Sequence, residues 1–134
     1  MSKFFIFFII ICVFLIDVHP GFCFPSPHPI QLYEQGIRQL NSSSSEGKTD
    51  SQVQDIFLAL IKKFPYSPLG YLGMSYVYRH DAYRGNKKYD VEFLKDNAYP
   101  FALKALRLGP SIRAVHENYA FFQELFFIEE IDNN

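Results

Sequence analysis

The sequence lacks most of the residue patterns on which enzymes and metal sites are built. Its 134 residues hold two cysteines, no tryptophan and seven glycines, and the glycines form no phosphate-binding loop. The three histidines after residue 23 are far apart and have no cysteine or carboxylate cluster at metal-ligand spacing. No serine or cysteine stands in the context of a catalytic nucleophile. We therefore expect a protein that is not an enzyme and that binds neither a metal nor another cofactor.

The chain also lacks an excess of charge of either sign, because its formal net charge is −1. The charges are nevertheless unevenly distributed. Residues 56–113 contain ten Lys/Arg and four Asp/Glu, whereas the segment after Arg113 contains five acids and no base. Since no basic excess extends over the domain, we do not expect a nucleic acid as partner.

The N-terminus has the pattern of a secretory signal peptide spanning residues 1–23. Lys3 gives it a short positive start, and residues 4–16 are an unbroken apolar run. A membrane-spanning helix needs about 20 apolar residues, so this run is too short for one. We expect cleavage between Cys23 and Phe24, or after Gly21. The alternatives are an uncleaved membrane anchor and a buried core helix.

The cysteines bear on localisation as well. Cys12 lies inside the apolar run and would leave with the signal, so the mature chain cannot form an internal disulfide. Cys23 would allow a lipid anchor, although Phe22 stands where lipid attachment requires a small residue. We expect an exported protein, secreted or periplasmic. If the N-terminal segment is retained, the protein would instead be anchored to the membrane.

Apolar residues recur at helical spacing in five segments of the mature chain, which predicts an all-α fold of about five helices. Residues 24–29 are a Pro-rich leader, and the helical domain spans residues 30–134. The first helix should begin near Pro29 and end at a polar loop over residues 41–50. This loop contains a glycosylation sequon that begins at Asn41.

Prolines and capping residues set the expected bounds of the other helices. From Val53 to Phe64, apolar residues fall at i, +3, +4, +7, +8 and +11, and Pro65 ends this second helix. The expected N-caps of the third, fourth and fifth helices are Ser67, Asp90 and Ser111. Pro100 lies inside the fourth helix and removes one backbone hydrogen bond, so we expect a kink or a restart there.

An internal repeat relates the two halves of the domain. At an offset of 45 residues, Val53, Phe57, Leu60 and Pro65 recur as Ala98, Ala102, Ala105 and Pro110. At the same offset, Met74, Ser75 and Tyr78 recur as Tyr119, Ala120 and Gln123. The three alanines lie on one helical face and the following Gly-Pro breaks the helix, a pattern typical of an αα-hairpin with closely packed helices.

This pattern resembles the tetratricopeptide repeat (TPR), a helical hairpin with a period of 34 residues. The first-helix signature is matched by Tyr71, Met74, Ser75 and Tyr78, and the second-helix signature by Phe57 and Pro65. The extra residues in each period, about 11, are close to three helical turns, so longer helices can absorb them. The resemblance implies a short TPR-like solenoid of αα-hairpins that binds a peptide or a partner protein.

The resemblance also implies that the first helices of the hairpins form a concave binding surface. The groove candidates on these helices are Tyr71, Ser75, Tyr78, His116, Tyr119 and Gln123. The last helix is apolar on two sides, and its second apolar side includes Phe121, Leu125, Phe127, Ile128 and Ile131. This side either lies between other helices or forms an interface with another chain or a second copy.

Two alternatives to an exported binding module stay open. The segment from Phe64 to Pro68 resembles a turn of exported bacterial repeat proteins, including outer-membrane assembly lipoproteins. The first alternative is therefore a membrane-anchored or lipoprotein component of an envelope assembly or transport complex. The second is an enzyme, which would need a pocket that joins His80, Asp81 and His116.

Overall fold

The computed structural model describes residues 27–43, 51–84 and 88–132. Its helices are α2 (Pro29–Ser42), α3 (Ser51–Lys63), α4 (Pro68–Ala82), α5 (Val91–Phe93), the π-helix η1 (Leu94–Ala98), α6 (Tyr99–Leu108) and α7 (Arg113–Asp132). Two-residue strands, β1 (Tyr83–Arg84) and β2 (Lys88–Tyr89), pair antiparallel between α4 and α5. Because α5, η1 and α6 follow one another without a break, the described residues form five helical rods. The expected all-α fold is confirmed.

The N-terminal predictions fall outside the described residues. These are the signal peptide, its cleavage between Cys23 and Phe24, and the first three residues of the Pro-rich leader. Within the part that the structure describes, no helix has the length and apolar character needed to cross a membrane.

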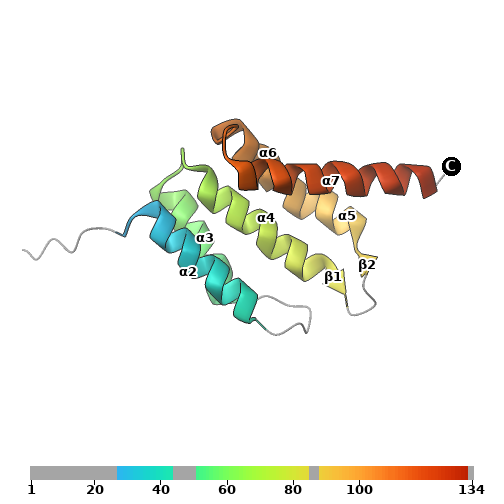
Figure 1. The fold of residues 1–134 in the computed structure, drawn as a ribbon. Helices are drawn as coiled ribbons and strands as arrows, with labels where there is room; N and C mark the ends of the chain where they lie inside the picture. Colours follow the sequence, from blue (N-terminus) through green and yellow to red (C-terminus); the bar gives the residue numbers. More distant parts are fainter. Residues whose placement is uncertain (1–26, 44–50, 85–87, 133–134) are drawn as a thin grey trace, which may run out of the picture.

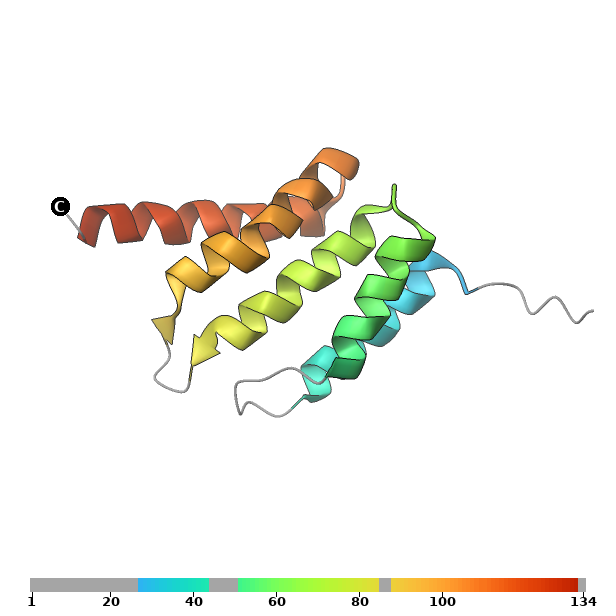
Figure 2. The same ribbon diagram turned by 180° about the vertical axis from the view of Figure 1, so that it is seen from behind.

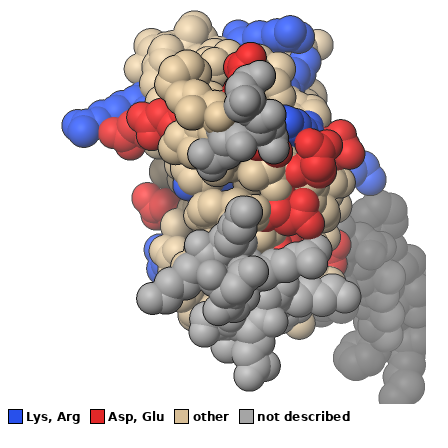
Figure 3. Space-filling model, turned by 90° about the vertical axis from the view of Figure 1, so that its right-hand side faces the viewer, with Lys and Arg blue, Asp and Glu red and all other residues tan. Residues whose placement is uncertain are grey.

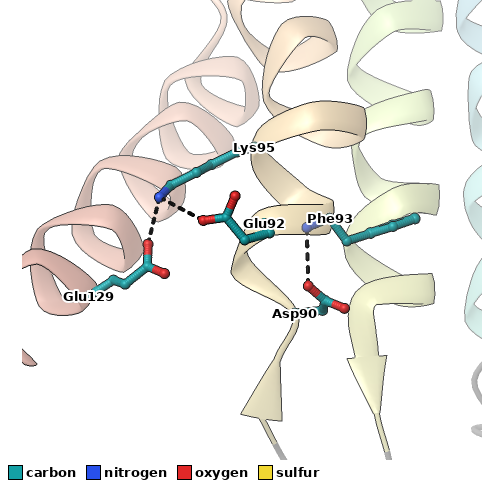
Figure 4. Close-up of polar contacts among 5 residues, drawn as sticks. All are labelled: Asp90, Glu92, Phe93, Lys95 and Glu129. Carbon is teal, nitrogen blue, oxygen red and sulfur yellow. Dashed lines mark hydrogen bonds and ion pairs between the residues drawn. The ribbon is translucent and has the colours of Figure 1, made fainter. Parts of the chain in front are cut away.

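Three helix starts lie where the sequence predicts them. The first helix begins at Pro29, after His28 as N-cap. The Ser67 hydroxyl accepts a hydrogen bond from the Leu69 N–H at the start of α4. The Asp90 carboxylate accepts one from the Phe93 N–H (3.1 Å), as Figure 4 shows. Each cap satisfies a backbone donor that the first helical turn leaves without a partner.

The predicted cap at Ser111 is wrong, because this residue lies in the turn before the last helix. The α7 helix begins at Arg113, and the Ile112 carbonyl accepts hydrogen bonds from the N–H groups of Val115 and His116. The Ile112 side chain packs against the core cluster of Leu72, Ala105 and Val115. This packing places Ile112, one residue after Ser111, at the cap position.

Pro100 interrupts the fourth rod as its missing N–H requires. In η1, the Tyr99 N–H bonds to the Leu94 carbonyl, five residues back, and α6 then starts with Pro100 in its first turn. A π-turn adds one residue to the turn, which accommodates a ring that would clash with a regular α-helix. The expected kink or restart therefore takes the form of a π-helical segment followed by a new α-helical start.

The helices form two layers, and α4 is the middle helix of one of them. In Figure 1, α2, α4 and α7 lie toward the viewer, and α3 and the α5–α6 rod lie behind them; Figure 2 shows the reverse side. The central helix, α4, packs against α2, α3, η1, α6 and α7. Helices of the two layers alternate along the chain, so neighbours in sequence pack against each other.

The 45-residue repeat of the sequence is also a repeat of the structure. The α3 and α6 helices end at Lys63 and Leu108, and α4 and α7 begin at Pro68 and Arg113, so both pairs of boundaries are 45 residues apart. The repeated core positions Val53, Phe57, Leu60, Ala98, Ala102 and Ala105 are all buried. In the second helices of the repeat, Met74 and Ser75 are buried, whereas Ala120 and Gln123 are exposed. The difference arises because α4 is covered on several sides and α7 is the last described helix.

Phe57 occupies the space between α2, α3 and α4. It is fully buried, and its ring lies against two glycines, Gly36 of α2 and Gly73 of α4. A Cβ atom on Gly36 would lie 2.5 Å from the Phe57 ring, and one on Gly73 would lie 2.1 Å from it. Since real Cβ contacts are longer than 3.0 Å, only glycine lets α2 and α4 approach the ring this closely.

An ion-pair cluster ties the end of α7 to η1. The Lys95 ammonium lies 2.7 Å from the Glu129 carboxylate and 3.4 Å from that of Glu92 (Figure 4). The hydrogen bond to Glu129 is the main reason why the pKa of Lys95 is raised. These contacts position the last two turns of α7, which carry the exposed side chains of Phe127 and Ile128.

Candidate functional site

A pocket of about 430 Å³ lies between α2 and α4, beside the β1–β2 pair. In Figure 1 it belongs to the region where α2 and α4 lie next to each other, near β1. Its lining residues come from α2 (Ile37, Leu40, Asn41), from α4 (Tyr76, Arg79, His80), and from the two strands (Tyr83, Tyr89). This volume is in the range of small-ligand and side-chain pockets.

Arg79 brings a positive charge to the pocket. Its Nη1 donates a hydrogen bond of 2.7 Å to Asn118 of α7, and its guanidinium carbon lies 3.6 Å from the centre of the Phe121 ring. Its Nε is buried and has no acceptor among the described residues. No described carboxylate forms an ion pair with it. Burial lowers the pKa of Arg79, an effect that Tyr89 and Tyr76 oppose, but a guanidinium stays charged at neutral pH.

A buried polar chain fixes the position of Arg79. The Asn118 amide donates a hydrogen bond of 2.9 Å to the Ser75 hydroxyl and accepts the one from Arg79. Both Asn118 and Ser75 are buried, at 2% and 0% exposure. An amide has a donor end and an acceptor end, so its use in both directions holds α4, α7 and the guanidinium in one arrangement.

The other walls of the pocket are aromatic or apolar. Leu40 is 7% exposed, and the rings of Tyr83 and Tyr89 lie 5.2 Å apart. Burial raises the pKa of Tyr76, so its hydroxyl is neutral and contacts the Ala114 carbonyl. Over residues 27–43, 51–84 and 88–132, no carboxylate lines this pocket. The site combines a half-buried cation with aromatic area, which suits it to binding.

The groove candidates on α4 face the α6 side of that helix. Tyr78 stacks on Phe101, with ring centres 5.7 Å apart, and Tyr71 lies 6.5 Å from the same ring. The Tyr71 hydroxyl also donates to the Pro65 carbonyl. Ser75, the third candidate on this helix, is the buried partner of Asn118. These residues therefore contribute to packing between α4, α6 and α7.

The candidates on α7 lie elsewhere. Tyr119 stacks on Tyr99, with ring centres 6.1 Å apart, and the Gln123 amide is 3.5 Å from the Tyr99 hydroxyl. His116 is exposed and contacts the Pro110 carbonyl at the start of the helix. The six predicted groove residues are thus not brought together in one site.

Sequence reasoning missed the stripe of α4 that does line the pocket. Counted from Tyr76, the lining residues Arg79, His80 and Tyr83 come three, four and seven residues later, which is also a helical pattern, although Tyr83 itself lies in β1. This periodicity could have identified the stripe, but an arginine and a histidine near a helix end are typical of a solvated surface. The chosen stripe, with Tyr71, Ser75 and Tyr78, lies next to it on the same helix.

The second apolar side of α7 is divided between core and surface. Phe121 and Leu125 pack against the cluster that contains Ala82, Leu94 and Phe122. Beyond them, Phe127, Ile128 and Ile131 are 65%, 56% and 59% exposed. Figure 3 views the side of the molecule where α7 ends and shows acidic atoms in several groups, with uncharged surface between them. The expectation that this side lies between other helices therefore holds for Phe121 and Leu125, and the interface expected of the exposed residues stays a prediction.

The residues of the enzymatic alternative are not gathered in the pocket. His80 lines it and lies 3.8 Å from Asp81, whereas His116 is not among its lining residues. Over the described ranges 27–43, 51–84 and 88–132, no group of three or more His, Cys, Asp or Glu side chains could hold a metal ion.

Comparisons of the sequence and the structure with protein-family models, curated proteins and solved structures gave no match. Function is therefore inferred from the geometry of the chain itself.

Proposed function

We propose that this chain is an exported, non-enzymatic binding module that holds a peptide or a segment of a partner protein. The observation that carries this proposal is the pocket between α2 and α4, with its three tyrosines and its apolar wall. Tyrosine offers rigid contact area together with a hydroxyl group, and it is frequent where proteins bind one another. A pocket of about 430 Å³ accommodates one or two side chains of a bound peptide.

The arrangement of the helices supports this function. The helices that correspond to the first members of the proposed TPR-like hairpins are α2, α4 and α7, and they lie in one layer (Figure 1). A repeat scaffold of this kind would bind its partner along that layer. The pocket lies there, between the first two of the three helices.

Asn41 offers a direct test, because it is exposed and lines the pocket. We expect phage display of random peptides against the protein recovered from the cell to yield binders. Asn41→Trp should fill the pocket from its rim, exclude the bound side chain from it, and so weaken peptide binding about tenfold or more. Gln35→Trp places the same side chain on an exposed position of α2 outside the pocket lining. This control should bind like the original chain.

The proposal fails if no displayed peptide is enriched, or if Asn41→Trp and Gln35→Trp bind the enriched peptides equally well. Circular dichroism of both variants establishes that each is folded. Both positions lie on exposed parts of a helix, where substitutions usually change stability by less than about 0.5 kcal/mol.

The exposed apolar end of α7 favours a second candidate, a membrane-anchored or lipoprotein component of an envelope complex. Phe127, Ile128 and Ile131 offer a contact surface to a neighbouring subunit or to a second copy. Intact mass spectrometry and cell fractionation separate the two candidates. A soluble species that begins at Phe24 supports the exported module, whereas a full-length or lipidated species in the membrane fraction supports the envelope component.

A further inference from the structure

The charge of the pocket is unbalanced. Its described lining includes the guanidinium of Arg79 and the imidazole of His80, and no carboxylate of the described residues. The pair formed by His80 and Asp81 is 3.8 Å long and does not involve Arg79. Buried charges in proteins are normally paired, because removal from water without compensation costs several kcal/mol. A half-buried guanidinium that has no ion-pair partner among the described carboxylates is therefore unusual in a concave site.

The contacts that Arg79 makes offset the cost of burying its charge only in part. One amide oxygen accepts from Nη1, the Phe121 ring covers one face of the guanidinium at 3.6 Å, and the Tyr76 ring lies 5.5 Å from it. The Tyr89 hydroxyl also interacts with the guanidinium, but all of these groups are uncharged. The buried Nε has no acceptor among the described residues. Because a guanidinium carries five N–H donors in one plane, those of its amino groups that the fold does not use can still donate to a planar anion.

The surroundings of the guanidinium limit the kind of anion. Ile37 and Leu40 form an apolar wall, and Tyr76, Tyr83 and Tyr89 add aromatic area. Among the described side chains, no lysine and no second arginine line the pocket, so these side chains would neutralise only part of the charge of a phosphate. A carboxylate has one charge and two oxygens that match the guanidinium fork. The ligand that fits is a carboxylate attached to an apolar group.

We propose that Arg79 binds the carboxylate of an apolar ligand, with the apolar group lying against Ile37, Leu40 and the tyrosines. This inference rests on the proposed function and makes it more specific, because a peptide that ends in an apolar residue carries both groups at its C-terminus. A free apolar acid carries the same chemistry. The side chains of Asn118 and Ser75 act as positioning residues that hold the guanidinium at the pocket.

The test uses acetylated tetrapeptides that differ in their last residue (Leu, Ile, Val, Phe or Tyr), each as a free acid and as a C-terminal amide. Their affinities for the full protein are measured by isothermal titration calorimetry, together with that of 3-phenylpropionate. We expect at least one free acid to bind about tenfold or more tightly than its amide, since a hydrogen bond to a charged group is worth a factor of that size.

Substitutions of Arg79 then identify the residue responsible. Arg79→Met should bind the acid and the amide equally and weakly, and Arg79→Lys, which keeps a cation, should retain part of the preference. Arg107→Met removes the same charge from an exposed position of α6 and should behave like the original chain. Heteronuclear NMR spectra of each variant show whether the fold is kept, and Arg79→Lys provides the answer if Arg79→Met unfolds.

Two results would overturn the inference: no free acid binds better than its amide, or the preference survives in Arg79→Met. In either case, peptides selected by display and blocked by Asn41→Trp would leave the proposed peptide-binding function standing. If 3-phenylpropionate binds as tightly as the best tetrapeptide, the carboxylate site is supported and a peptide as its natural ligand is contradicted. If the tetrapeptide binds more tightly, both are supported.

Discussion

Phe57→Ala should lower the free energy of unfolding by about 3–5 kcal/mol, the range observed when a fully buried phenylalanine is truncated. The ring is the largest fully buried side chain of its core cluster, which also contains Leu40, Val53, Leu60 and Met74. It contacts α2 and α4 at glycines, which have no side chain to move into the space that it leaves. Urea denaturation followed by circular dichroism measures the loss.

A double-mutant cycle tests why the glycines are there. Gly73→Ala should destabilise the protein by about 1–3 kcal/mol, because its Cβ would overlap the Phe57 ring. In the Phe57→Ala background the same substitution should be neutral or stabilising, since the ring is gone and alanine favours helix by about 1 kcal/mol over glycine. The two substitutions should therefore not be additive.

Gly70 provides the matched control for this cycle. A Cβ on Gly70 would lie 2.7 Å from the Ile61 side chain and 2.9 Å from its backbone nitrogen, contacts that do not involve the Phe57 ring. Gly70→Ala should therefore be destabilising in both backgrounds. Additive effects of Phe57→Ala and Gly73→Ala would contradict the interpretation that ring and glycine are fitted to each other.

The features that the sequence predicted are those that depend on local chemistry. Helix periodicity, the caps at Ser67 and Asp90 and the interruption at Pro100 follow from residues within one or two turns of each other. The 45-residue repeat is also visible without coordinates, because both halves use the same spacing of core residues. The all-α fold could therefore be predicted from sequence.

The features that the sequence did not predict depend on which face of a helix meets which neighbour. Periodicity shows that α4 has an apolar stripe, but this helix packs against five others, so almost every face is apolar or half-buried. The stripe with Tyr71 and Tyr78 matches a repeat signature, which predicts that it lines a groove. In the structure it packs against α6.

The sequence does not indicate that Arg79 lies in a pocket, for a related reason. In the sequence it is a charged residue near the end of a helix, where a cation is favoured by the helix dipole and is typically solvated. Its burial depends on Phe121, and its hydrogen bond on Asn118, which stands 39 residues later in the chain. No pattern within α4 specifies that contact. The site therefore becomes visible only when α7 is placed beside α4.

The second large effect that we expect concerns this contact. Asn118→Leu should destabilise the protein by about 3 kcal/mol, because it leaves the buried Ser75 hydroxyl and the Arg79 guanidinium without their shared partner. An unsatisfied buried polar group costs about 1–3 kcal/mol, and more if it is charged. Leucine has a similar size, so the loss would come mainly from the missing hydrogen bonds. Urea denaturation again gives the magnitude.

Arg79→Met in the Asn118→Leu background should restore part of this stability, because it removes the guanidinium that had lost its partner. Arg107→Met, an exposed substitution with the same change in charge, should restore none. The double variant with Arg79→Met could instead be less stable than Asn118→Leu alone. In that case the Phe121 ring stabilises the guanidinium, and the charge does not destabilise the fold. The position of Arg79 would then be explained by packing. If stability is restored, the charge of Arg79 is not needed for the fold. This is what we expect of a residue that is kept for binding.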